Sequence, residues 1–255
     1  MPGLHYRARG PAYDKIQLMS AHRRQFIRTL SAAGMAAVAV PGVFAQQLSR
    51  TTAMTTEGPF YPDKLPLDTD NDLLILNDAI TPGIGEITHL TGRVTTPSGQ
   101  AIRNAIVEIW QVDQGGSYIH TGGRQPSGFD SNFQGYGRFL TDSQGRYYFR
   151  TIKPVEYTLV GIHRCPHIHM AISKSGERVF TSQLMVKGHP ANAKDMLITG
   201  LDAASRETVL ADFTPLPGSK LGELAANWDI VLGRTVEEFQ NGPVKGFGRP
   251  QNRRR

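Results

Sequence analysis

Polar and apolar residues alternate over residues 166–173, which read Pro-His-Ile-His-Met-Ala-Ile-Ser. Successive side chains of a β-strand point to opposite faces, so His167 and His169 share one face while the apolar residues at 168, 170 and 172 share the other. The pattern predicts a strand with one face in a core. Imidazole is the commonest protein metal ligand, and two such rings can reach one ion. Paired histidines also occur on wet strand faces and in hydrogen-bonded cores, so this motif alone leaves the metal site as one of three interpretations.

Similar short runs recur along the chain at the spacing typical of an antiparallel β-sandwich. Turn-forming segments such as Pro97-Ser98-Gly99 and Lys174-Ser175-Gly176 separate them. The predicted strands span residues 89–94, 105–112, 146–151, 157–160, 166–173, 179–186 and 228–232. We therefore expect an all-β fold.

Three segments break the strand pattern. Residues 55–62 are rich in Gly and Pro and predict a lead-in loop. Residues 113–139 carry glycines at seven positions and predict one long loop, which in a compact domain is usually functional. A single helix is predicted over residues 202–212, with Asp202 or Ser205 as its N-cap, packed at the sandwich edge.

The length of the chain indicates one domain, and its positive charge is concentrated at the two ends. A chain of 255 residues with 39% apolar residues can bury one sizeable core. The net charge of +6 divides into +5 for residues 1–45, +5 for residues 245–255 and −4 for the body between them. Because the body is mildly acidic, the high isoelectric point does not indicate a nucleic-acid partner. We expect residues 46–240 to form the β-sandwich domain and residues 241–255 to be a disordered basic tail.

The first 45 residues resemble an export signal. Arg23 and Arg24 precede Phe26 and an apolar, Ala-rich run, and Val43-Phe44-Ala45 offers small residues for cleavage. This order predicts a twin-arginine signal peptide and an exported, periplasmic or extracellular protein that meets a membrane only during export. Gly34, Pro41 and Gly42 interrupt the run, which argues against the alternative of an uncleaved membrane anchor. Met19 offers a second possible start.

Cys165 is the only cysteine, so the chain has no internal disulfide. It lies beside the two histidines, where a reactive thiolate would be exposed to oxidation. We therefore interpret Cys165 as a small buried residue.

Four motifs follow one another in an order typical of one enzyme family. They are Glu108-Ile109-Trp110-Gln111 with the segment 115–120, then residues 132–138 with Thr141-Asp142, then residues 149–154 with Tyr157, and last residues 164–169. Together they resemble the intradiol ring-cleavage dioxygenases, most closely the catalytic β chain of the protocatechuate-cleaving branch. The likeness extends from about residue 56 to residues 228–232, nearly the whole of the chain after the signal.

The resemblance implies a prealbumin-like β-sandwich with long active-site loops around one mononuclear, non-haem Fe(III) ion. The iron ligands would be Tyr118, Tyr157, His167 and His169. The family's active-site arginine falls on Arg164, and its supporting glutamine falls on Gln183. A trivalent cation favours the phenolate form of tyrosine, and two phenolates in turn favour Fe(III) over Fe(II).

The resemblance also implies the reaction. A catechol-type diol displaces the tyrosinate at Tyr157, which takes a proton as it leaves, and O2 is inserted to give a cis,cis-muconate-type diacid. Arg164 would supply fixed positive charge where the ring gains carbanion character. The segment between Tyr157 and His167 is shorter than in the protocatechuate-cleaving branch, so catechol, protocatechuate, hydroxyquinol and larger lignin-derived diols all stay open as substrates. The family forms homodimers and mixed larger assemblies.

Alternatives remain beside this interpretation. A secreted β-sandwich could bind a ligand without turnover, or act as a structural subunit of a dioxygenase. A zinc hydrolase using His167 and His169 lacks an evident third His or carboxylate ligand. We expect His120, His163 and His189 to be solvated or hydrogen-bonded outside the site, and Tyr61 to line the pocket mouth.

Overall fold

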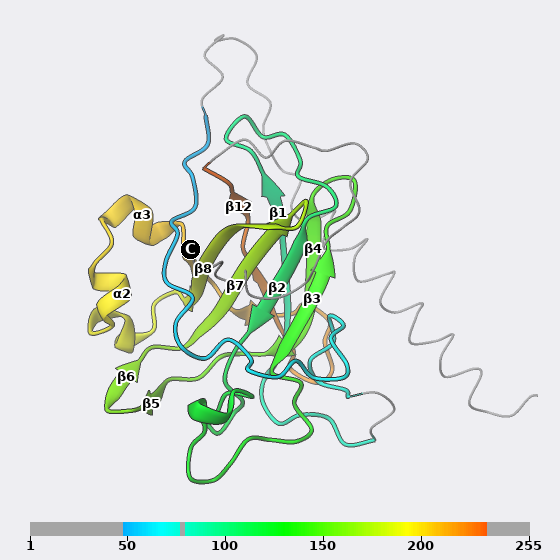
Figure 1. The fold of residues 1–255 in the computed structure, drawn as a ribbon, viewed down its shortest axis with the longest axis vertical. Helices are drawn as coiled ribbons and strands as arrows, with labels where there is room; N and C mark the ends of the chain where they lie inside the picture. The colour runs from blue at the N-terminus through cyan, green and yellow to red at the C-terminus, as the bar shows by residue number, and fades with distance from the viewer. Residues whose placement is uncertain (1–47, 77–79, 234–255) are drawn as a thin grey trace, which may run out of the picture. The chain divides into compact units, whose positions relative to one another are not determined.

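The computed structural model describes residues 48–76 and 80–233 (Figure 1). The chain divides into two units, Met1–Ala45 and Gln46–Arg255. The predicted signal peptide and the basic tail lie outside the described residues and stay predictions. No helix within the two described ranges is long and apolar enough to cross a membrane.

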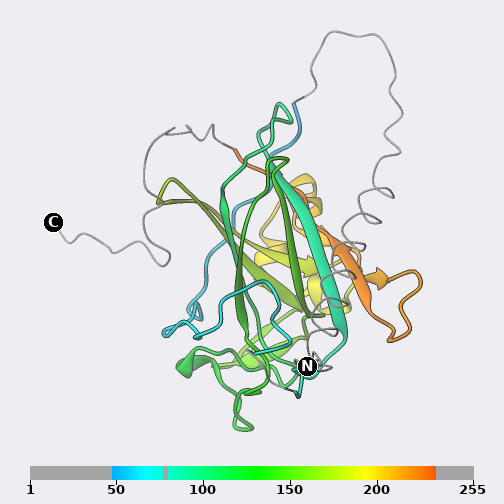
Figure 2. The same cartoon turned by 90° about the vertical axis from the view of Figure 1, so that its right-hand side faces the viewer.

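The first sheet is built around β1 (Ile87–Thr95), which pairs antiparallel with β4 (Arg146–Ile152). β11 (Leu224–Asn227) and β12 (Ile230–Val231) both run parallel to β1 in the same register, so they act as one interrupted strand. β10 (Thr214–Pro215) forms an antiparallel hairpin with β11, seen in orange beside β1 in Figure 2.

The second sheet holds the alternating strand of the sequence. Its strand order is β3 (Tyr136–Leu140), β2 (Ile106–Trp110), β7 (His167–Lys174), β8 (Glu177–Val186) and β9 (Leu210–Ala211). β2, β3, β7 and β8 pair antiparallel, whereas β9 runs parallel to β8. The predicted all-β sandwich is confirmed, with parallel pairs at β1–β11, β1–β12 and β8–β9 in addition to the expected antiparallel ones.

Both sheets contribute to one hydrophobic core. Ile168, Met170 and Ile172 of β7 are fully buried in it, together with Leu90 of β1 and Phe149 of β4. His167 and His169 are also buried, but on the other face of β7. The face assignment made from the alternating pattern is therefore confirmed, and the core fixes the direction in which both imidazoles point.

The predicted helix over residues 202–212 is wrong in length. α3 spans only Ala203–Glu207, capped by the Asp202 side chain, which accepts hydrogen bonds from the backbone of Ala204 and Ser205. The Met185 amide donates to the Val209 carbonyl, and β9 follows at once, so pairing with β8 ends the helix. Three further short turns of helix were not predicted. They are α2 (Met196–Thr199), η1 (Thr121–Gly123) and η2 (Pro190–Ala193).

The predicted loop over residues 113–139 ends too late, because β3 begins at Tyr136. The glycines of this segment indicated a loop, although Gly137 lies within a strand. A Cβ on Gly137 would lie 2.7 Å from the Asp70 carbonyl oxygen and 2.6 Å from Leu73 Cδ1. This strand position therefore needs glycine for close approach of the segment around residue 70, and not for a turn.

A two-stranded hairpin, separate from both sheets, consists of β5 (Tyr157–Leu159) and β6 (Ile162–Arg164) (Figure 1, lower left). Its two-residue turn has positive φ at both positions, +53° at Val160 and +75° at Gly161. This is the turn that favours Asn-Gly. A β-branched residue at the first position costs about 1–2 kcal/mol.

The lead-in segment (residues 48–62) lies along the second sheet and connects it to the end of the first. The Thr55 amide donates to the Thr181 carbonyl of β8, and the Thr52 amide donates to the Val231 carbonyl of β12. The segment then continues past β7, and Gly58 comes close enough that a Cβ there would lie 3.4 Å from His169 Cε1. The lead-in segment therefore forms part of the surroundings of the two histidines.

Candidate metal centre

Four side chains converge beside the histidine face of β7. His167 and His169 come from β7, Tyr157 begins β5, and Tyr118 lies in the loop after β2. The Tyr118 hydroxyl lies 3.0 Å from the Tyr157 hydroxyl, 3.1 Å from His167 Nε2 and 2.8 Å from His169 Nε2. The two Nε2 atoms are 3.2 Å apart, and Tyr157 Oη lies 3.4 Å from His167 Nε2. The structure thus brings together all four residues expected to bind metal.

These separations fit a single ion. Two N or O ligands bound at about 2.0–2.2 Å to one metal, with bond angles between a right angle and the tetrahedral angle, are about 2.8–3.6 Å apart. The five separations given above, from 2.8 to 3.4 Å, lie in this range. Residues on three different elements hold these atoms, so the cluster is a product of the fold and not of one motif.

The protonation of His167 also suits a metal ligand. Its Nδ1 lies 2.6 Å from the Cys165 carbonyl oxygen, which can only accept a hydrogen bond. Nδ1 therefore carries the proton and Nε2 presents its lone pair to the cluster, an arrangement common in metal-binding histidines. His169 is held differently, since its ring stacks on Trp110 at 4.8 Å between centroids with an interplanar angle of 8°.

Burial keeps the cluster neutral in the absence of a cation. Burial and the positive charge of Arg164 lower the pKa of His167 to about 3, and burial and His167 lower the pKa of His169 well below its ordinary value. Burial and the neighbouring Tyr157 raise the pKa of Tyr118, and burial raises the pKa of Tyr157. A bound trivalent cation would reverse the preference of the phenols, because it stabilises phenolate directly.

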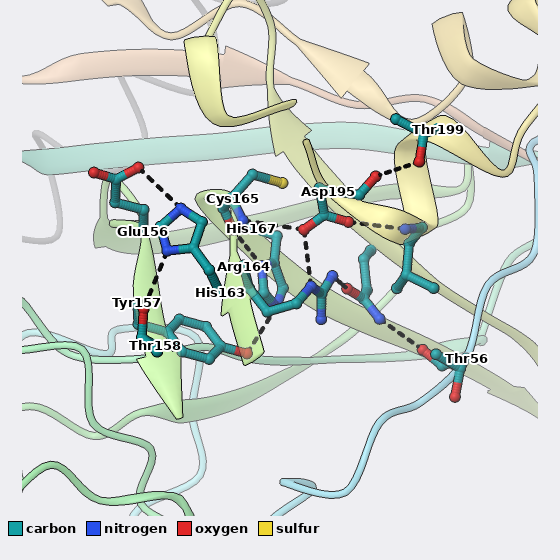
Figure 3. Close-up of polar contacts among 12 residues, drawn as sticks. Thr56, Glu156, Tyr157, Thr158, His163, Arg164, Cys165, His167, Asp195 and Thr199 are labelled. Atoms are coloured by element: carbon teal, nitrogen blue, oxygen red, sulfur yellow. Dashed lines mark hydrogen bonds and ion pairs between the residues drawn. The ribbon is translucent and has the colours of Figure 1, made fainter. Parts of the chain in front are cut away.

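Arg164 ends β6 directly opposite Tyr157 in the hairpin register. Its Nε donates to Asp195 Oδ2 at 2.8 Å (Figure 3). Its Nη2 donates to Gln183 Oε1 at 2.7 Å. Gln183 in turn donates to the Thr56 carbonyl of the lead-in segment at 2.8 Å. Gln183 therefore contacts Arg164, as a supporting residue would, and the two bonds fix the guanidinium plane.

Asp195 was missed by the sequence reasoning. Its side chain is fully buried, accepts from the Cys165 amide at 3.0 Å, and caps α2 through the Leu197 amide. Although burial raises its pKa, the hydrogen bond and charge of Arg164 outweigh this and lower the pKa of Asp195 to about 2. An N-cap signal before α2 could have marked the residue. The ion pair with Arg164, 31 positions away, has no local signal.

Cys165 is buried, as expected. Burial and the carboxylate of Asp195 raise the pKa of its thiol to about 12. The thiolate is the nucleophilic and metal-binding form, so this cysteine is inert at neutral pH. The cysteine contributes its backbone to the site and not its sulfur.

A pocket of about 330 Å³ opens onto the cluster. Tyr157, Arg164 and His169 line it. The remaining lining residues come from the lead-in segment and the hairpin: Gly58, Pro59, Phe60, Leu159, Val160 and Ile162. The pocket thus joins two of the four donor side chains to a surface that is mostly apolar.

The prediction that Tyr61 lines the pocket mouth is wrong. Tyr61 is 7% exposed, and its hydroxyl donates to Glu108 Oε1 at 2.8 Å. Glu108 also accepts from Tyr136 at 2.6 Å and from Arg178 at 2.8 Å. This buried carboxylate therefore draws Tyr61 inward, and the neighbouring Phe60 takes the place at the pocket.

The three histidines that were expected outside the site do lie outside the cluster, and each is hydrogen-bonded. His120 and His189 cap η1 and η2, and His163 interacts with Glu156 and Thr158. Within residues 48–76 and 80–233, no group of three or more His, Cys, Asp and Glu side chains is arranged to hold a metal. The zinc hydrolase alternative accordingly lacks its third ligand there, and a metal at this site depends on the two tyrosines.

Comparison with known proteins finds similarity to dioxygenases in the family model, in curated relatives and in a solved structure. A family model described as Dioxygenase matches residues 56–234. The protocatechuate 3,4-dioxygenase β chain of Burkholderia cepacia is 35% identical over 66% of this chain and 72% of its own length. Catechol 1,2-dioxygenase 1 of Acinetobacter lwoffii is 28% identical over 78% of this chain and 65%, less than two thirds, of its own length. The dioxygenase domain of a dioxygenase carbohydrate-binding protein fusion from Streptomyces sp. SirexAA-E shares the fold, with a TM-score of 0.53 at 24% identity, over 72% of this chain and 98% of that domain.

Proposed function

This chain belongs to the intradiol ring-cleavage dioxygenase family, and we propose that it uses one non-haem Fe(III) ion and O2 to cleave a catechol-type diol. The bond broken would be the one between the two hydroxylated ring carbons. Both oxygen atoms would enter the product, a cis,cis-muconate-type dicarboxylate. The protein would thus serve aromatic catabolism.

The observation that carries the proposal is the convergence of two phenol oxygens and two imidazole nitrogens, each of which lies within 3.4 Å of at least two of the others. Hard phenolate ligands suit ferric iron, and the neutral Nε2 of His167 is already oriented toward the centre. Tyr118, Tyr157, His167 and His169 are therefore the proposed ligands. When bound, Fe(III) would draw electron density from the diol and make its ring reactive toward O2.

The chain's own residues divide the remaining tasks. Tyr157 lines the pocket whereas Tyr118 does not, so the Tyr157 oxygen is the group placed to accept a proton from an arriving diol. Arg164 lines the same pocket with its guanidinium fixed by Asp195 and Gln183. It would stabilise negative charge that develops on the ring, and removing such a group typically costs on the order of a hundredfold in rate.

The test is the visible absorption spectrum and the iron content of the purified protein, recorded with and without catechol in the absence of O2. Tyrosinate bound to Fe(III) gives a charge-transfer colour that should shift when the diol binds. A protein that stays colourless after ferric reconstitution would contradict the proposal and leave a non-catalytic binding sandwich.

Tyr157→Phe provides the matched variant. We expect it to change the colour and to abolish O2 consumption, because it removes both a ligand and the proton acceptor. Tyr148→Phe is the control, since the Tyr148 hydroxyl bonds His89 on the other sheet, and it should keep colour and turnover. We further propose that residues 1–45 direct export, which a size comparison of the exported and intracellular forms would test.

A further inference from the structure

The β5–β6 hairpin supplies both a proposed catalytic pair and a wall of the pocket. Tyr157 and Arg164 face each other across it, and Leu159, Val160 and Ile162 line the pocket between them. Pro59 and Phe60 of the lead-in segment line the same pocket. We call these five apolar residues, Pro59, Phe60, Leu159, Val160 and Ile162, the apolar rim.

The apolar rim keeps two large side chains in solvent without a packing reason. Val160 is 84% exposed and Ile162 is 51% exposed. Val160 also occupies a left-handed backbone position, φ +53°, where Asn or Gly would be more favourable. Neither burial nor backbone preference accounts for valine here. Contact with an apolar ligand would account for it, because the side chain is part of the pocket lining.

The size of the pocket leaves room beyond a single ring. A cavity of about 150 Å³ is enough to take up benzene. The pocket measures about 330 Å³. A diol ring that reaches Tyr157 and His169 would therefore leave space toward the rim for a substituent on the ring.

The charges around the pocket disfavour an anionic substituent. Of the nine described residues that line it, only Arg164 carries a permanent charge. Its guanidinium already forms an ion pair with the buried Asp195 and a hydrogen bond with Gln183. A carboxylate directed toward the apolar rim would lose part of its water to apolar side chains without gaining a cation, which is costly.

We propose that the apolar rim binds an uncharged, apolar substituent of the diol ring, so that alkyl- or aryl-substituted catechols are better substrates than ring carboxylates. This inference rests on the proposed function and adds the substrate class to it.

The test compares 4-tert-butylcatechol with 3,4-dihydroxybenzoate, which carry an apolar and an anionic group at the same ring position. Oxygen uptake by the iron-loaded full chain gives kcat/KM for each diol and for unsubstituted catechol. We expect kcat/KM for 4-tert-butylcatechol to be about tenfold or more higher than kcat/KM for 3,4-dihydroxybenzoate. A kcat/KM for 3,4-dihydroxybenzoate equal to that for 4-tert-butylcatechol would overturn the proposal.

Val160→Asn tests the rim without endangering the fold, because Asn tolerates the left-handed turn. Loss of the contact between the substrate and one methyl group corresponds to about a fourfold decrease in kcat/KM. We therefore expect kcat/KM for 4-tert-butylcatechol to fall at least about fourfold while that for catechol stays unchanged. Leu221→Asn is the control, since Leu221 is 78% exposed but does not line the pocket. Equal changes for both diols in Val160→Asn would contradict the role of the rim.

Binding of the same two substituted diols under anaerobic conditions, measured by titration calorimetry, separates this inference from the proposed function. If neither diol is consumed, the proposed function fails, and the ratio of the two dissociation constants still tests the rim. A ratio that favours the carboxylate would overturn the inference even in an active enzyme.

Discussion

Asp195→Asn separates the role of the buried carboxylate in positioning Arg164 from its role in stability. Asparagine keeps the size of the side chain and an oxygen that can cap α2, but it removes the charge that faces the guanidinium at 2.8 Å. The pKa of Asp195 is about 2 against an ordinary value of 3.8, which corresponds to about 2 kcal/mol in favour of the ionised form. Because asparagine resembles the neutral form, we expect a loss of about 2 kcal/mol in the free energy of unfolding.

The effect on catalysis follows from the same contact. Without the Asp195 carboxylate, the hydrogen bond to Gln183 still holds the Arg164 guanidinium. Complete removal of such a charge costs on the order of a hundredfold in rate, so its partial misplacement should lower kcat by about tenfold, with a smaller change in KM. The assay is O2 uptake per bound iron, at a temperature well below the unfolding transition of the variant.

Asp72→Asn is the matched control. Asp72 is also buried and lies 3.3 Å from an arginine, Arg150, but neither residue lines the pocket. This variant should lose stability and keep kcat. If Asp195→Asn loses stability to the same extent and keeps kcat per iron, then Asp195 has only a structural role and the positioning argument is refuted.

Three further outcomes are expected. Since the pKa of Asp195 is lowered in the folded state, the contribution of its carboxylate to the free energy of unfolding is complete above about pH 4 and is lost as the pH falls toward 2. Urea unfolding of the iron-free protein should therefore show the stabilities of wild type and Asp195→Asn converging near pH 2. Glu108→Gln should destabilise the fold by about 2–4 kcal/mol in the same assay, because Glu108 is the more buried of the two carboxylates that pair with Arg178, the other being Glu57. Gly137→Ala should lower the melting temperature by several degrees, because its Cβ would overlap Leu73; an unchanged melting temperature would show that the segment around residue 70 can move away.

The sequence was most informative where the alternation of polar and apolar residues along a strand coincided with a motif. Alternation along β7 correctly separated the core face from the imidazole face. The four proposed ligands were then found through the order of the motifs, and the fold brings them together. Neither signal depends on knowing which strands are neighbours.

The remaining features depended on contacts that are distant in sequence. Strand β3 was hidden because Gly137 serves a close approach of the chain near residue 70, which has no local period. The predicted helix was too long because β8 provides a pairing partner for residues 210 and 211. Tyr61 was misplaced because the buried Glu108 accepts its hydroxyl. In each case a tertiary contact overrode the local preference.

The lead-in segment has a consequence for the order in which the protein matures. Gly58 lies beside His169, and Thr56 anchors Gln183 across 127 positions of sequence, so the pocket closes only when distant parts of the chain have met. Domains rich in such long-range contacts fold slowly. The unfolded chain offers no preformed site, so metal affinity appears only with the fold and adds to its stability. Under the proposed function, iron supply during biosynthesis should therefore limit the yield of active protein at a late step, after the lead-in segment has docked, and not during synthesis of the chain.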